Sequence, residues 1–151
     1  MKLGEALSLR ALQAQQLSDL RQRINVNVTG QEGSTPSEDP SELLGQFKKL
    51  SEEHAELIRR ITLTNVTDGI LDSLQRREHL RRVRNVLEGA SRGANQVGAI
   101  GRYMRSELKS ISFVSVAALQ EEIEKLTEDI RVLDAQIQQR NWDVELLGTE
   151  Q

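Results

Sequence analysis

Apolar residues recur at helical spacing along four stretches of the chain. Side chains three and four residues apart share one side of an α-helix, because the helix has about 3.6 residues per turn. The pattern predicts helices at about residues 2–25, 40–64, 70–91 and 116–147. We therefore expect a mainly α, single-domain protein (residues 1–151), built as a four-segment antiparallel bundle of coiled-coil character with one short extended segment at about 108–114.

Two connections carry recognisable turn signals. A polar stretch rich in Gly, Ser, Thr and Pro predicts a loop at residues 29–39. Asp39 can accept a hydrogen bond from the first turn of the next helix, and Pro40 suits the first helical position. Asp68-Gly69 predicts the turn after the second helix.

Two other stretches depart from the helical pattern. Repeated glycines lower helix propensity between the third and fourth helices and predict a loop, or a frayed helix end, at 92–102. Partial alternation of apolar and polar residues from Leu108 to Val116 predicts extended chain. A lone strand leaves its backbone unpaired, so we expect it to pair with Val26–Thr29 or with the same segment of another subunit.

Each predicted helix has one candidate inner face. In the first helix it comprises Leu3, Leu7, Ala14, Leu17 and Ile24, with Arg10 and Arg21 in the same stripe. In the second it comprises Leu43, Phe47, Leu50, His54, Leu57 and Ile61. In the third it comprises Leu74, Arg77, Arg81, Arg84 and Leu87, widened by Leu80, Val83 and Val86.

The fourth helix has the most regular pattern. Its heptad seam comprises Leu119, Ile123, Leu126, Ile130, Leu133 and Ile137. Such a seam requires a partner helix, which can come from the same chain or from a second copy. Trp142, near the end of this helix, is suited to fill an interface pocket. We treat these residues as a candidate oligomer seam.

Charge is distributed unevenly. The net charge is −3, but residues 59–109 carry 11 basic and 5 acidic residues, and the rest carry 9 basic and 18 acidic. The basic middle can pair with the acidic ends, or it can bind phosphates or nucleic acid. Because a nucleic-acid-binding domain is usually basic overall, we expect internal pairing and no nucleic-acid partner.

A mixed cluster of charged and aromatic residues is the strongest candidate for chemistry. It comprises Arg77, Glu78, Arg81, Arg84, Arg102, Tyr103, Arg105, Glu107 and Lys109. Arginines on a half-apolar helix face bind anions through paired hydrogen bonds, or they form a partly buried ion-pair network that specifies packing. We favour the network.

Other chemistry has little support in the sequence. The chain has no cysteine and two histidines, so we expect no disulfide and no metal site. No nucleophile–base motif or phosphate-binding loop is present, so we expect no cofactor and no enzymatic activity. Glu5 and Arg10 interrupt any signal peptide, and no apolar stretch is long enough to span a membrane, so we expect a cytoplasmic protein.

Several short stretches resemble a family of small bacterial and phage-borne proteins labelled "septicolysin". They are the opening MKLGEAL, Ser37–Pro40, Leu57–Ile61, Thr64-Asn65, Arg77-Glu78, Tyr103–Lys109, Val116–Gln120 and Asn141-Trp142. The resemblance implies a mostly helical fold, and its label implies a membrane-active cytolysin. The residues themselves favour a non-enzymatic assembly module, a homo-oligomer, over that alternative and over an anion binder.

Overall fold

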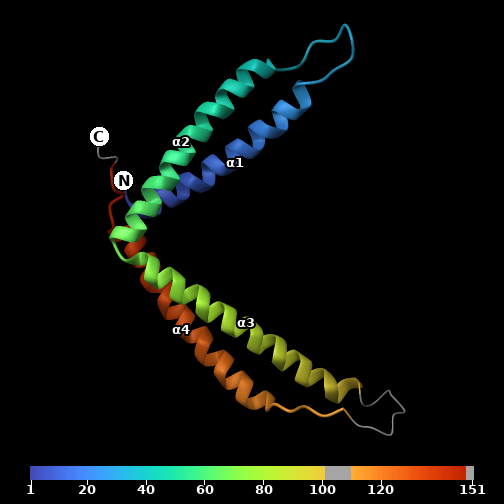
Figure 1. Cartoon of the computed structure of the whole chain (residues 1–151), viewed down its shortest axis with the longest axis vertical. Coiled ribbons are helices and arrows are strands. Elements are labelled where there is room, and N and C mark those ends of the chain that lie inside the picture. The colour runs from blue at the N-terminus through green and yellow to red at the C-terminus, as the bar shows by residue number, and fades with distance from the viewer. Residues whose placement is uncertain (101–109, 149–151) are drawn as a thin grey trace. The chain divides into compact units, whose positions relative to one another are not determined.

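The chain is almost entirely helical in the regions that the structure describes. A computed structural model describes residues 1–100 and 110–148. It has four helices, α1 Leu3–Asn27, α2 Pro40–Thr67, α3 Ile70–Ile100 and α4 Val116–Asp143 (Figure 1). The predicted mainly α fold is confirmed.

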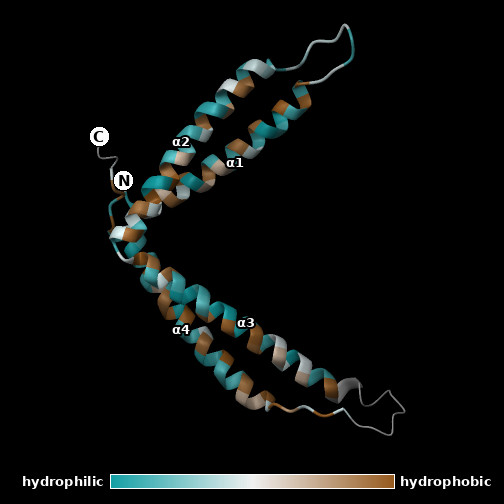
Figure 2. Cartoon of the chain, in the orientation of Figure 1, coloured by the Kyte–Doolittle hydropathy of each residue, from teal (hydrophilic) through white to brown (hydrophobic). Residues whose placement is uncertain are grey.

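Contacts divide the chain into two compact units. One comprises Met1–Gly69 with Gln139–Gln151, and the other comprises Ile70–Gln138. The first unit contains the α1/α2 pair together with the last turn of α4 and the segment after it. The second contains α3 and most of α4. In each unit two helices run side by side, and Figure 2 shows hydrophobic positions interspersed with hydrophilic ones along all four.

The α1/α2 pair buries one stripe from each helix. In α1 the buried stripe has an almost strict seven-residue repeat, comprising Leu3, Ala6, Gln13, Leu20 and Asn27. The α2 stripe confirms the predicted face, with Leu43, Leu57 and Ile61 buried and Phe47, Leu50 and His54 half-buried. Predicted inner-face residue Ala14 is instead exposed, because Gln13 takes the inward position beside it.

Local signals explain where the helices begin and end. Asp39 Oδ1 accepts a hydrogen bond from the Ser41 amide at 2.8 Å, and Pro40 is the first residue of α2, as predicted. Ser115 caps α4 by accepting from the Ala118 amide at 3.2 Å. Gly69 has a φ of +73°, a conformation that favours glycine, and it supplies the predicted turn after α2.

The loop predicted at 92–102 is instead helical as far as Ile100, and the strand pairing expected for the extended segment is not seen among the described residues. Helix α3 continues to Ile100, because isolated glycines weaken a helix by only about 1 kcal/mol each. Residues 110–115 contain bends, and the described residues form no strand; residues 101–109 lie outside the described chain. Val26 and Asn27 belong to α1, so the proposed strand partner is helical. Among the described residues, β-type pairing occurs as an isolated antiparallel bridge between Lys2 and Glu145.

The α3/α4 pair is antiparallel and has a constant register. Arg77 contacts Asp134, and Ser91, fourteen residues later, contacts Gln120, fourteen residues earlier. The apolar layer between them includes Leu80 of α3 and the buried isoleucines of α4, Ile123, Ile130 and Ile137.

Candidate functional site

The best-connected part of the first unit is a junction that we call the terminal clasp, formed by residues 1–3, residues 144–147 and the last turns of α2. The Leu3 amide donates to the Val144 carbonyl, and the Leu146 amide donates to the Met1 carbonyl, both at 2.9 Å. Leu3 is fully buried and Leu146 is 7% exposed. These bonds tie the segment after α4 to the beginning of α1.

Side chains of α2 complete the clasp. Thr64, 1% exposed, donates its hydroxyl to the Arg60 carbonyl and accepts from the Leu147 amide at 3.0 Å. Arg60 Nε donates to the Leu147 carbonyl at 2.8 Å. A buried polar group without a hydrogen-bond partner destabilises the fold. Thr64 therefore favours the one position of residues 144–147 in which the Leu147 amide reaches its hydroxyl.

Charged groups close the clasp on its exposed side. Lys2 Nζ lies 2.9 Å from Glu145 Oε1, and the terminal ammonium lies 3.1 Å from Oε2. The hydrogen bond from Lys2 and then that from the terminal ammonium hold the pKa of the Glu145 carboxyl below its ordinary value of 4.5. Gly4 permits the approach of Trp142, because a Cβ at Gly4 would lie 3.1 Å from the indole ring.

A buried polar layer crosses the middle of the α1/α2 seam. Gln13 Oε1 lies 3.2 Å from His54 Nδ1, and Gln13 is 7% exposed. Farther along, the Asn27 amide group donates to the Arg23 carbonyl and its oxygen accepts from the Glu38 amide at 3.0 Å. A paired polar layer inside an apolar seam favours one register over others.

The structure brings the α3 arginines of the predicted cluster to the α4 interface. Arg77 Nη1 donates to Asp134 Oδ1 at 2.9 Å, and Arg81 Nη2 donates to Oδ2 at 3.3 Å. Arg84 Nε lies 3.6 Å from Glu88 one turn along the same helix. Predicted member Glu78 is exposed.

Two arginine groups in this layer lack a hydrogen-bond acceptor. The Nε atoms of Arg77 and Arg84 are buried and form no hydrogen bond with any residue that the structure describes. Arg77 still has its Asp134 partner, whereas the contact of Arg84 with Glu88 is too long for a hydrogen bond. The remaining predicted members, Arg102, Tyr103, Arg105, Glu107 and Lys109, lie outside the described residues.

The heptad seam of α4 is already used within the chain. Its isoleucines are 3–8% exposed, and Leu119, Leu126 and Leu133 are half-buried. The partner helix that the heptad pattern requires is therefore supplied by α3 of the same chain. Trp142 is 56% exposed and rests against Gly4.

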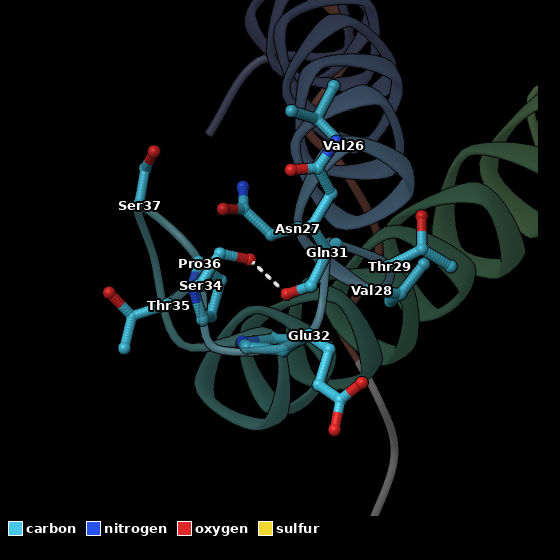
Figure 3. Close-up of a pocket in the computed structure, with 12 residues that line it drawn as sticks. Val26, Asn27, Val28, Thr29, Gln31, Glu32, Ser34, Thr35, Pro36 and Ser37 are labelled. Atoms are coloured by element: carbon cyan, nitrogen blue, oxygen red, sulfur yellow. Dashed lines mark hydrogen bonds between the residues drawn. The ribbon is translucent and has the colours of Figure 1, made fainter.

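The connection between α1 and α2 surrounds an open hollow of about 670 Å³ (Figure 3). Within this loop the Ser34 hydroxyl donates to the Gln31 carbonyl at 2.6 Å. Asn27, its buried polar lining residue, has both ends of its amide engaged. The hollow therefore offers a ligand mainly exposed loop groups.

The residues that the structure describes lack two kinds of feature. No group of three His, Asp or Glu side chains in them is arranged to hold a metal ion. None of their helices combines the length and the apolar character needed to cross a membrane.

Sequence reasoning missed the polar residues that fix the packing. Gln13 and Asn27 occupy the same seven-residue repeat as Ala6 and Leu20, so this spacing was a detectable signal. Thr64 gave no comparable signal, because its partner Leu147 is 83 residues away.

Comparison with known proteins gives two matches and corrects one expectation. A crystal structure of a functionally unknown conserved protein from Corynebacterium diphtheriae is similar, with 30% identity and a TM-score of 0.87 over 97% of this chain and 99% of that one. Curated proteins give no match. The resemblance to "septicolysin" proteins was wrong: the family model that matches carries no such label. That model covers residues 10–146, and the chain belongs to its family, a family of unknown function (DUF6847).

Proposed function

We propose that this protein is a non-enzymatic helical assembly module that associates with further copies of itself. The observation that carries the proposal is the balance of buried and exposed apolar side chains. Among the described residues, twelve apolar side chains are buried, whereas fifteen large ones are exposed. Each unit is built around a pair of helices, and a pair buries one stripe per helix.

The exposed residues are spread over helices as well as loops. Leu12, Leu44, Ile58 and Leu63 of the α1/α2 pair are 41–54% exposed, and Val86 of α3 is 67% exposed. Single exposed apolar residues are ordinary, but a thin core gains burial when another layer covers it. The polar contacts between paired helices support the same proposal. They hold the two helices of each pair in one register, so that each pair presents a constant outer surface.

Solution mass tests the proposal directly. Light scattering and sedimentation would be measured over a wide concentration range, at low and moderate salt. We expect a discrete oligomer that dissociates on dilution, since the exposed apolar residues are spread over helices and loops. A single monomeric species at every concentration would contradict self-association.

A further inference from the structure

Two links of different kinds join residues 1–69 to the rest of the chain. One is covalent, the two-residue turn Asp68-Gly69 between α2 and α3. The other is non-covalent, and consists of the terminal clasp and the last turn of α4 beside it. Between the two links the chain runs through the whole of the second unit, residues 70–138, before it returns to the first unit at residue 139.

The non-covalent link is extensive. In addition to the bonds of the clasp, Arg140 Nη2 donates to Asp68 Oδ2 at 2.9 Å, and Lys2 Nζ donates to the Asp143 carbonyl at 3.0 Å. Both cations lie at helix C-termini, those of α2 and α4, where a positive charge is stabilising. None of these contacts requires that residues 139–148 belong to the same copy of the chain as residues 1–69.

The covalent link is short and depends on a glycine. Gly69 has a φ of +73°, and a Cβ at this position would meet no atom within 4 Å. The need for glycine therefore comes from the backbone of the turn and not from neighbouring side chains. A short hinge between two compact units favours the exchange of identical elements between copies.

We propose that two copies of this chain associate by exchanging everything after the Asp68-Gly69 hinge, from Ile70 onward. Each terminal clasp is then formed by residues 1–69 of one copy and residues 139–148 of the other. The inference rests on the self-assembly proposed above and gives it a route. In the exchanged dimer, the first unit of either copy is incomplete without its partner.

The exchange needs no additional apolar surface. Every contact of the clasp, including the burial of Leu3, Thr64 and Leu146, is remade between the two copies. The closed and exchanged forms therefore differ mainly in the hinge and in the entropy of association. Their balance depends on protein concentration, and it shifts with a substitution that acts on the hinge alone.

A substitution at the hinge tests the exchange. Gly69→Ala should lower the dissociation constant of the dimer at least ~10-fold, because alanine disfavours the positive φ of the closed turn and each dimer opens two hinges. Gly33→Ala is the matched control, since Gly33 has a φ of +84° and equally open surroundings but lies in the loop between α1 and α2. Sedimentation should show an unchanged dissociation constant for this control. A Gly69→Ala chain that associates like the control would contradict the exchange.

A disulfide across the clasp shows which copy supplies residues 139–148. Lys2 and Glu145 face each other in an antiparallel bridge that has a backbone hydrogen bond on either side. In such a pair the Cα atoms are about 4.5 Å apart, within the range that a disulfide spans. Because the chain has no native cysteine, the double variant Lys2→Cys/Glu145→Cys introduces the two thiols needed for this bridge and no others.

Dimers of the double variant would be isolated under reducing conditions, oxidised and separated on a denaturing gel without reductant. We expect a covalent dimer, with the single variant Lys2→Cys as the control for random cross-linking. Bridges confined to single chains would overturn the exchange but preserve self-assembly through another surface. A wild-type chain that is monomeric at every concentration would overturn self-assembly itself.

Discussion

The two helix pairs solve the same packing problem with different side chains. The α1/α2 seam contains neutral polar groups, and Gln13, Asn27 and Thr64 all have partners. The α3/α4 seam instead contains arginines, and the Nε atoms of Arg77 and Arg84 have no hydrogen-bond partner among the described residues. A neutral paired layer costs little to desolvate, whereas a partly buried guanidinium needs a carboxylate beside it.

The two units therefore owe the specificity of their helix packing to different contacts. The first unit adds the terminal clasp to its apolar stripe, with Leu3 and Ile61 almost completely buried. The second relies on Asp134 to neutralise Arg77 and Arg81. We therefore expect the second unit to respond to salt and to charge substitution, and the first to respond mainly to loss of apolar volume.

The largest expected effect comes from removing apolar volume in each unit separately. Ile61→Ala in α2 and Ile130→Ala in α4 should each lower the free energy of unfolding by about 2–5 kcal/mol, through lost burial and the cavity left behind. Ile61 is 2% exposed and Ile130 is 4% exposed, so the two substitutions are well matched. Urea denaturation gives the total loss.

Hydrogen exchange would show where the loss occurs. If the units open separately, Ile61→Ala should speed amide exchange chiefly in α1 and α2, and Ile130→Ala chiefly in α3 and α4. Equal acceleration in all four helices after either substitution would show that the two pairs unfold as one.

A smaller effect is expected at the charged layer. Asp134→Asn leaves Arg77 and Arg81 without their carboxylate, and should lower the free energy of unfolding by about 1–2 kcal/mol because the group is only partly buried. Raising the salt concentration should narrow the difference from wild type. The exposed Asp129→Asn is the control on the same helix, and an equal loss there would indicate a general charge effect.

The fold class could be predicted because helical periodicity is a local property of the chain. The heptad of α4 and the cap at Asp39 depend on residues within a few turns, and both are present in the structure. Boundaries were less predictable where local preference is weak. Helix α3 passes through Gly89 and Gly93 because the cost of these glycines is small beside the packing of the helix as a whole.

The polar contacts between distant segments could not be predicted with the same success. The α3 arginines were recognised as a cluster, but Asp134, the shared partner of Arg77 and Arg81, is more than fifty residues away. The bond between Thr64 and Leu147 leaves no pattern in either neighbourhood. Such pairs depend on the register of the packed helices, and single-sequence periodicity does not specify it.

The smallest expected effect is on the pH dependence of stability, which distinguishes a long-range ion pair from a local one. Lys2 and the terminal ammonium lower the pKa of Glu145, and Arg131, three residues along the same helix, lowers that of Glu128. A carboxyl whose pKa is lowered by folding stabilises the fold above its ordinary value of 4.5, and that contribution is lost as the pH falls through the lowered pKa. Glu145→Gln should therefore reduce the melting temperature at neutral pH and converge with wild type well below pH 4.5. Glu128→Gln should have less effect, because its pair closes no junction between distant segments. If instead the two variants lose the same stability at neutral pH, the ion pairs of the terminal clasp contribute no more than an ordinary surface pair, and the clasp is held by Thr64 and its backbone bonds.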